Sequence, residues 1–255
     1  MKIAIIQYPG TNCEYETCSA IRSCGIEAEI FRWNRQIEEL EEFDAFVLAG
    51  GFSYQDRVRA GAIAAKKPII KTIMRKAEEG APVLGICNGA QILIESGICP
   101  SLKKGSIEMA LSFNRETGFL CDWVYVKVSS IKSPFLSLFN LGDVFPIPIA
   151  HAEGRFTTQN KGLLLELIEN DQIALRYCTK NGEIIDEFPI NPNGSIYNIA
   201  GLTNKEGNVF ALMPHPERAS FVYQIPRKKQ ASARKIFEGI KDFYKTNSLP
   251  FGDRS

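Results

Sequence analysis

The feature that most constrains this chain is the alternation of short apolar segments with helical segments in its N-terminal part. Strand-like segments span 2–8, 27–33, 45–49 and 82–86, and each is followed by a helical segment. Strands that alternate with helices form a parallel sheet covered on both faces. The sequence therefore predicts an α/β fold with a mostly parallel, doubly wound sheet flanked by helices.

The C-terminal half follows a different pattern. Beyond residue 100, strand-like segments are separated by turn pairs such as Asn181-Gly182 and Asn193-Gly194, which favours antiparallel pairing. These predicted strands span 119–130, 145–150, 173–178, 196–202 and 208–213. We therefore expect an antiparallel extension of the same sheet, followed by a basic amphipathic helix over 228–245.

Length and composition are those of one globular domain. The 255 residues are 45% hydrophobic and 23% charged, which is typical of a globular protein with a large core. We expect a single domain over 1–246 and a frayed tail over 247–255. The formal net charge of +1 gives no argument for a nucleic-acid or membrane partner. Without a signal peptide or a membrane span, the sequence predicts a cytoplasmic protein.

A sharp turn follows the fourth predicted strand. It places Cys87 between Gly85 and Gly89, and a helix begins near Ala90. A strand, a tight glycine-containing turn and a helix form the elbow that exposes the nucleophile in many hydrolases. The N-terminus of the helix would favour a thiolate at this position. The motif predicts that Cys87 is a nucleophile, and the alternative is a buried, inert cysteine.

A cysteine nucleophile needs a base, and the chain has only two histidines. Both begin a His-x-Glu triplet, at 151–153 and at 215–217. In an extended segment residues i and i+2 point the same way, so either glutamate could orient its own histidine. Prolines on both sides of His215 favour an extended segment there. The residues alone leave both histidines open as the base.

The other cysteines predict no metal centre. The chain has seven cysteines and no C-x-x-C pair, so we expect neither a structural zinc site nor a disulfide framework. Cys13, Cys18 and Cys24 lie on different faces of a predicted helix and are expected to fill the core. No other metal-ligand cluster is apparent from the spacing.

Five segments together resemble one family. Segments 85–91 (GICNGAQ) and 213–218 (MPHPER) resemble the class I, or triad-type, glutamine amidotransferases. Segments 7–13 (QYPGTNC), 49–56 (AGGFSYQD) and 148–156 (PIAHAEGRF) narrow the resemblance to the glutaminase subunits of phosphoribosylformylglycinamidine synthases. The segments follow in a consistent order along most of the chain.

The resemblance implies a flavodoxin-like fold and a triad of Cys87, His215 and Glu217. In such a triad the cysteine attacks the side-chain amide of glutamine and a γ-glutamyl thioester forms. The histidine transfers the thiol proton to the departing ammonia, and the glutamate fixes the histidine tautomer. The backbone N–H groups of Gly51 and Asn88 are implied to bind the oxyanion.

The resemblance also implies secondary roles around the triad. Gly50, Gly51, Gln91 and Asn114 are implied to bind glutamine. His151 and Glu153 are implied to have a supporting role only.

The partners are also implied by the resemblance. The sequence has no phosphate-binding loop motif, and the amination of an amide requires activation by ATP. We therefore expect no cofactor or metal on this chain, which would take L-glutamine and release ammonia. ATP and Mg²⁺ are expected on a large synthetase subunit that converts formylglycinamide ribonucleotide to formylglycinamidine ribonucleotide in purine biosynthesis, together with a small accessory subunit.

The sequence leaves alternative functions open for this chain. The chain could be an amidotransferase with a different acceptor, another hydrolase or peptidase on the same scaffold, or a catalytically weak docking subunit.

Gln55 and Ala152 stand where the family usually has glycine, and Ala90 where phenylalanine is common. A positive φ at Gln55 would strain its loop. No role is transferred to 157–195.

Overall fold

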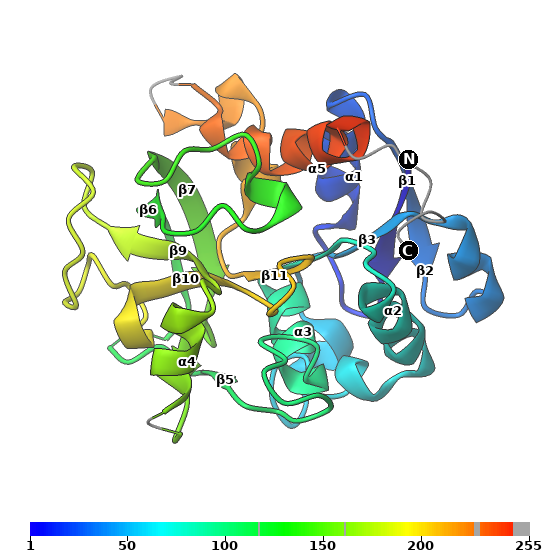
Figure 1. The fold of residues 1–255 in the computed structure, drawn as a ribbon, viewed down its shortest axis with the longest axis horizontal. Coiled ribbons are helices and arrows are strands. Elements are labelled where there is room, and N and C mark those ends of the chain that lie inside the picture. The colour runs from blue at the N-terminus through cyan, green and yellow to red at the C-terminus, as the bar shows by residue number, and fades with distance from the viewer. Residues whose placement is uncertain (117, 161, 227–229, 247–255) are drawn as a thin grey trace.

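The computed structural model describes residues 1–116, 118–160, 162–226 and 230–246 (Figure 1). The strands of its large sheet are β1 (Lys2–Gln7), β2 (Glu27–Arg32), β3 (Ala45–Leu48), β4 (Val83–Ile86), β6 (Leu120–Val128), β7 (Val144–His151), β9 (Ile173–Cys178), β10 (Ile199–Thr203) and β11 (Val209–Leu212). The α-helices are α1 (Glu14–Ser23), α2 (Pro68–Glu78), α3 (Asn88–Ser96), α4 (Leu163–Glu169) and α5 (Lys235–Thr246). A small second sheet pairs β5 (Ala110–Ser112) with β8 (Arg155–Thr157).

The large sheet confirms the predicted fold class. Its strand order is β2-β1-β3-β4-β11-β10-β9-β6-β7. Neighbouring strands from β2 to β11 pair in parallel, and those from β11 to β7 pair antiparallel. The parallel half has the flavodoxin-like order, in which ligands bind beyond the carboxyl ends of the strands.

One strand lies in a different part of the sheet from that predicted. The sequence predicts that the strand over 208–213 belongs to the antiparallel extension. In the structure, the corresponding strand β11 pairs in parallel with β4. All four residues of β11 are buried, which suits a central strand covered on both faces. Its antiparallel hairpin with β10 makes β11 the boundary between the two halves of the sheet.

Several shorter elements also differ from the sequence prediction. The predicted helix over 38–43 is a 3₁₀ turn, and the C-terminal α-helix begins at Lys235 after another 3₁₀ turn. Helix α4 and strands β5 and β8 were not predicted, because each has seven residues or fewer and carries too little periodicity to be recognised. Residues 227–229 of the predicted C-terminal helix and the predicted tail over 247–255 lie outside the described residues.

Helices cover both faces of the parallel half of the sheet. Figure 1 shows α1 and α5 on one face and α2 and α3 on the other. Helix α2 illustrates the packing, because Ile69, Ile70, Ile73 and Ala77 recur at helical spacing and are buried. No helix in the described parts of the chain is long and apolar enough to cross a membrane.

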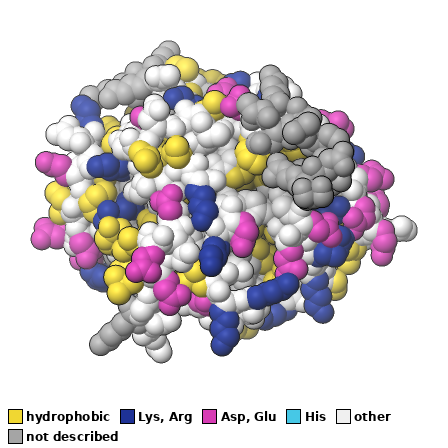
Figure 2. Space-filling model, in the orientation of Figure 1, with side chains coloured by type: hydrophobic (Ala, Val, Ile, Leu, Met, Phe, Trp, Pro, Cys, Tyr) yellow, Lys and Arg dark blue, Asp and Glu magenta, His cyan; other side chains and the backbone are white. Residues whose placement is uncertain are grey.

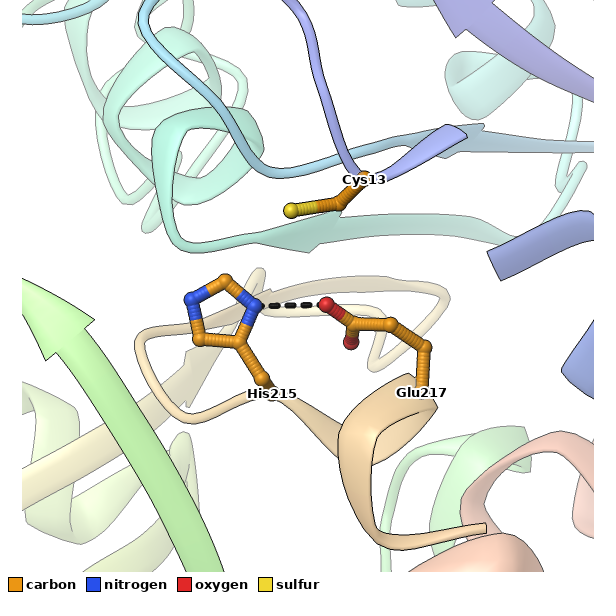
Figure 3. Close-up of side chains that lie close together, drawn as sticks. All are labelled: Cys13, His215 and Glu217. Atoms are coloured by element: carbon orange, nitrogen blue, oxygen red, sulfur yellow. Dashed lines mark hydrogen bonds and ion pairs between the residues drawn. The ribbon is translucent and has the colours of Figure 1, made fainter. Parts of the chain in front are cut away.

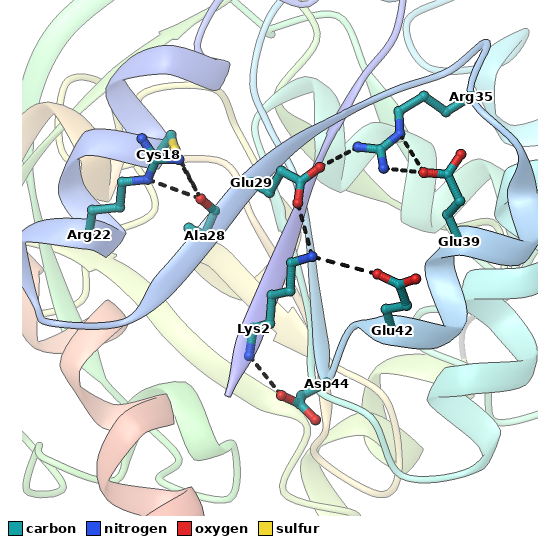
Figure 4. A network of polar contacts seen from close by, with 9 residues as sticks. All are labelled: Lys2, Cys18, Arg22, Ala28, Glu29, Arg35, Glu39, Glu42 and Asp44. Atoms are coloured by element: carbon teal, nitrogen blue, oxygen red, sulfur yellow. Dashed lines mark hydrogen bonds and ion pairs between the residues drawn. The ribbon is translucent and has the colours of Figure 1, made fainter.

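Ion pairs protect the edge strand β2. Lys2 lies 3.0 Å from Glu29, which also pairs with Arg35, and Arg35 in turn pairs with Glu39 (Figure 4). Charged side chains at a sheet edge oppose pairing with another chain. Figure 2 shows acidic and basic side chains interspersed on one face of the molecule, with no histidine visible there. Both histidines are in fact buried.

Candidate active site

Four loops at one edge of the parallel sheet bring the predicted catalytic segments together. They follow β1, β3, β4 and β11, which are neighbours in the sheet. The loop after β3 contains Gly50 and Gly51, the one after β4 contains Cys87, and the one after β11 contains His215. Because parallel strands end at the same edge, residues far apart in sequence meet there.

Cys87 occupies a strained elbow between β4 and α3. Its φ of 51° and ψ of −105° lie outside the regions that L-residues favour, as expected at the turn of such an elbow. Neither Gly85 nor Gly89 has a positive φ, so these glycines serve close packing instead. A Cβ at Gly89 would lie 1.9 Å from the carbonyl oxygen of Leu48, and one at Gly85 would lie 2.6 Å from that of Gly89.

His215 and Glu217 form a buried pair beyond the end of β11. The Nδ1 atom of His215 lies 2.5 Å from Oε1 of Glu217, and both residues are at most 2% exposed. Since an ionised carboxylate can only accept hydrogen bonds, Nδ1 carries the proton. In the neutral imidazole, Nε2 is therefore left with its lone pair available as a base. The backbone N–H of His215 donates to the carbonyl of Pro148, which fixes the segment against β7.

The charges around His215 favour its protonated form. Burial lowers the pKa of His215, but the Glu217 carboxylate, the charge of Cys87 and the nearby sulfurs of Cys13 and Cys87 together raise it well above its ordinary value. The Cys87 sulfur therefore lies close enough to His215 to interact with it. The resemblance implies this pair, and its catalytic role stays a prediction. Nε2 itself makes no hydrogen bond of good geometry, while the Cys87 thiol points to the carbonyl oxygen of Ala150 at 3.6 Å.

The backbone N–H groups of Gly51 and Asn88, which the resemblance implies bind the oxyanion, belong to the segments that follow β3 and β4. Asn88 is the first residue of α3, so its N–H has no acceptor within the helix. The backbone hydrogen bonds around Gly51 run from neighbouring residues, with Phe52 donating to the Gly10 carbonyl, and leave its own N–H unused. The side-chain oxygen of Asn88 accepts a hydrogen bond from the Ser53 N–H at 3.1 Å, which ties the two loops together.

The residues predicted to bind glutamine form internal hydrogen bonds. Gln91 accepts from the Asn88 amide at 2.8 Å and donates to the Glu153 carbonyl at 2.7 Å. Asn114 donates to the carbonyls of Gly118 and His151, and its own oxygen faces Nδ1 of His151 and the N–H of Gly154. The side-chain nitrogen and oxygen of Asn114 are therefore both engaged within the chain, and its role in binding glutamine stays a prediction.

His151 lies beside the triad but in a different environment. Its Nδ1 lies 3.1 Å from the Asn114 oxygen, which can only accept, so Nδ1 carries the proton here too. Burial, followed by the charge of His215, lowers the pKa of His151 to about 3. Its own triplet partner Glu153 accepts a hydrogen bond from the Ala60 N–H instead. His151 is therefore a neutral imidazole whose Nε2 is buried without a partner.

The loop after β3 carries backbone strain. Tyr54, Gln55 and Asp56 all have φ between 51° and 61°, so the residue that replaces the usual glycine at 55 does adopt a left-handed conformation. Such a conformation costs about 1–2 kcal/mol at a non-glycine residue. Burial and the nearby charge of Glu153 also raise the pKa of Asp56 to about 6.

Sequence reasoning missed Cys13, which lies against the triad rather than simply filling the core. Its sulfur, a nitrogen of His215 and a carboxylate oxygen of Glu217 lie within 4.8 Å of one another (Figure 3). A Cβ at Gly50 would lie 2.9 Å from the His215 ring and 3.2 Å from the Cys13 sulfur, so glycine is needed there. The signal available was position, since Cys13 follows the turn at the carboxyl end of the first strand.

This fold and the comparisons with known proteins define a glutamine amidotransferase. The family described as the CobB/CobQ-like glutamine amidotransferase domain matches residues 1–246. The solved structure of PurLQS from Thermotoga maritima contains a chain that matches with a TM-score of 0.76 and 34% identity, over 95% of this chain and 98% of that one. A putative GMP synthase subunit from Thermoplasma acidophilum, at 17% identity and a TM-score of 0.58 over 96% of each chain, shares the fold.

Curated relatives narrow the family. The PurQ subunit of phosphoribosylformylglycinamidine synthase from Methanothrix thermoacetophila is 48% identical over 95% of this chain and 98% of its own length. The PurQ subunit from Methanocaldococcus jannaschii is 44% identical over 96% and 99%. The chain belongs to this PurQ family of glutamine amidotransferase subunits, which confirms the resemblance read from the five sequence segments.

Proposed function

We propose that this chain is the glutaminase of a phosphoribosylformylglycinamidine synthase and that Cys87, His215 and Glu217 are its catalytic residues. The observation that carries the proposal is the meeting of a strained cysteine elbow and a buried histidine–glutamate pair at the ends of adjacent parallel strands, β4 and β11. This is the arrangement that thiol acyl transfer requires.

The reaction begins when Cys87 attacks the side-chain amide carbon of glutamine. His215 takes the thiol proton and gives it to the departing ammonia, while Glu217 holds the imidazole in one tautomer. The N–H groups of Gly51 and Asn88 bind the oxyanion, where each donor contributes about 3 kcal/mol. Water then attacks the γ-glutamyl thioester, so that glutamate leaves and the thiol is restored.

The other predicted residues support this chemistry from outside the triad. Gly50, Gly51 and Gln91 are proposed to bind glutamine. The lack of a side chain at Gly50 also allows His215 to pack closely against the loop. Asn114 holds His151 in one tautomer, and Glu153 fixes the loop that contains Ala60. We give His151 and Glu153 positioning roles.

The ammonia is proposed to pass to partner subunits. A large synthetase subunit and a small accessory subunit would convert formylglycinamide ribonucleotide to formylglycinamidine ribonucleotide, with ATP and Mg²⁺ on the synthetase and no cofactor on this chain. The related Thermotoga maritima chain comes from a structure of PurLQS, which supports such an assembly. A cytoplasmic location remains a prediction, and the seven free cysteines suit a reducing compartment.

The decisive experiment reconstitutes the chain with its synthetase and accessory subunits. With formylglycinamide ribonucleotide and ATP, we expect product from either glutamine or ammonium chloride, and little glutaminase activity from the isolated chain. Cys87→Ser should abolish only the glutamine-dependent reaction. Product formation from glutamine at the wild-type rate by Cys87→Ser would contradict the proposed nucleophile.

The same reconstituted complex distinguishes an active glutaminase from a catalytically weak docking subunit. A glutamine-mimicking electrophile should label Cys87 in the assembled complex. If no adduct forms there, and the complex uses ammonium chloride alone, the chain acts in assembly and the proposed glutaminase activity is wrong.

A further inference from the structure

A second sulfur lies beside the catalytic histidine. Cys13 follows β1, His215 and Glu217 follow β11, and all three side chains are buried. Their ligand atoms lie within 4.8 Å of one another (Figure 3). In Figure 3 the sulfur lies over the side of the imidazole that faces Glu217, whereas Cys87 reaches the histidine from the neighbouring strand β4.

The proposed acyl-transfer mechanism assigns no role to Cys13. Its thiol lies 3.2 Å from the Asn12 side-chain oxygen and accepts a hydrogen bond from Arg218 at 3.2 Å. Oε2 of Glu217, the oxygen that does not bond His215, is buried without any hydrogen-bond partner. An orphaned carboxylate oxygen within a fully buried residue calls for an explanation, and a bound ion is one of the usual ones.

The three side chains offer the donor set that zinc prefers. Thiolate sulfur, imidazole nitrogen and carboxylate oxygen bind Zn²⁺ at about 2.3, 2.0 and 2.1 Å respectively, with a fourth position left for water. Ligand atoms around such an ion lie about 3–4 Å apart, so Nδ1 of His215 and Oε1 of Glu217, which are 2.5 Å apart, must separate by about 1 Å to admit the ion. The nearby Arg218 is itself paired with Glu16 at 2.9 Å, and the Cys13 thiolate and Glu217 carboxylate together balance a dication.

We propose that Cys13, His215 and Glu217 form an inhibitory site for a soft divalent cation, with Zn²⁺ as the first candidate. On binding, the Cys13 thiol proton and the Nδ1 proton of the protonated His215 pass to solvent, and bonds from the sulfur, Nδ1 and a Glu217 oxygen to the metal replace them. Nε2 keeps its proton and has no lone pair to accept the thiol proton of Cys87. An imidazole bound to the metal no longer serves Cys87. The inhibition rests on the proposed catalytic role of His215, whereas the binding site stands on its own geometry.

Cobalt titration of the full chain tests the site without any activity measurement. Cys121 is the exposed cysteine, so all proteins carry Cys121→Ser to remove a competing thiol. Co²⁺ bound to a thiolate gives a near-ultraviolet sulfur-to-metal charge-transfer band. We expect this band in the parent and in the Cys87→Ser variant, and its loss in Cys13→Ser.

The two cysteines serve as matched controls for each other. A band that survives in Cys13→Ser but disappears in Cys87→Ser would place the metal on the catalytic thiol and overturn the proposal, as would the absence of a band in the parent. Cys13→Ala provides a second variant if Cys13→Ser fails to fold, with the unfolding midpoint as the check.

Zn²⁺ inhibition of the reconstituted complex tests the consequence. Each protein is compared with its own metal-free rate of glutamine-dependent turnover. We expect the Zn²⁺ concentration for half-inhibition to rise at least about tenfold in Cys13→Ser, as loss of a metal ligand implies. Unchanged sensitivity would overturn the inhibitory role. If the chain lacks glutaminase activity altogether, the cobalt band still decides whether the site exists.

Discussion

The two His-x-Glu triplets share a sequence pattern, and their histidines share a hydrogen-bonding pattern. In each, Nδ1 faces a side-chain oxygen and Nε2 is buried without a partner. The oxygen facing His215 belongs to its own triplet's Glu217, whereas the one facing His151 belongs to the amide of Asn114. One pKa is raised well above its ordinary value and the other is lowered to about 3.

The difference shows that the charge of the partner, rather than the pattern of the bonds, makes a buried histidine a base. Burial lowers the pKa of both imidazoles because it disfavours their charged form. For His215 the carboxylate of Glu217 is the largest contribution that opposes burial, and Cys87 and Cys13 add to it. A neutral amide at the same place orients His151 but leaves it unable to take up a second proton near neutral pH.

The largest expected effect is a difference in glutamine hydrolysis between variants of the two histidines. His215→Ala should lower glutamine hydrolysis in the assembled complex at least about 10⁴-fold, because the triad loses its base. His151→Ala should cost less than the roughly 10²-fold that a general base contributes and should leave thioester formation intact. Equal and total loss in both variants, measured by turnover and by labelling of Cys87, would contradict the assignment.

Replacing the partner charge should make His215 resemble His151. Glu217→Gln keeps a hydrogen-bond acceptor but removes the carboxylate that raises the pKa of His215. We expect turnover to fall about 10³- to 10⁴-fold and the pKa of His215, followed by NMR, to drop. The matched variant Glu153→Gln should change turnover by less than about fivefold, since Glu153 bonds Ala60 rather than its own histidine.

The close packing of His151 against Gly154 should be measurable as a change in the free energy of unfolding. A Cβ at Gly154 would lie 2.2 Å from the His151 ring, so Gly154→Ala should lower the free energy of unfolding by about 2–3 kcal/mol through overpacking. Gly118→Ala is the control, because a Cβ there meets nothing within 4 Å. Similar unfolding midpoints in denaturant for the two variants would show that the ring moves freely.

The smallest effect concerns Asp56, whose pKa is raised by burial and by the nearby charge of Glu153. The pKa of Asp56 is raised to about 6, so its ionised form destabilises the folded state. The penalty is absent below about pH 4, where the carboxyl is neutral in both states, and grows as pH rises to 6. Asp56→Asn should therefore stabilise the protein by on the order of 1 kcal/mol at pH 7, after allowance for partial exposure, and by nothing at pH 4. A gain of the same size at both pH values would refute this account.

The sequence predicted much of the fold because its signals are local. The strand–helix alternation, the glycines around Cys87 and the prolines around His215 each act within a few residues. The pairing of β11 with β4 could not be derived in this way, because it depends on which side of the sheet a distant strand joins. Elements such as β5 and α4 are too short to carry a period.

The sequence by itself determined the elbow, the two candidate histidines and, through five ordered segments, the family. Only the tertiary structure decided which oxygen faces each imidazole and brought Cys13 against His215. The physical reason is that a pKa or a metal-binding geometry depends on distances between side chains on different strands. Such distances are set by how the sheet is assembled, and no spacing along one chain encodes them.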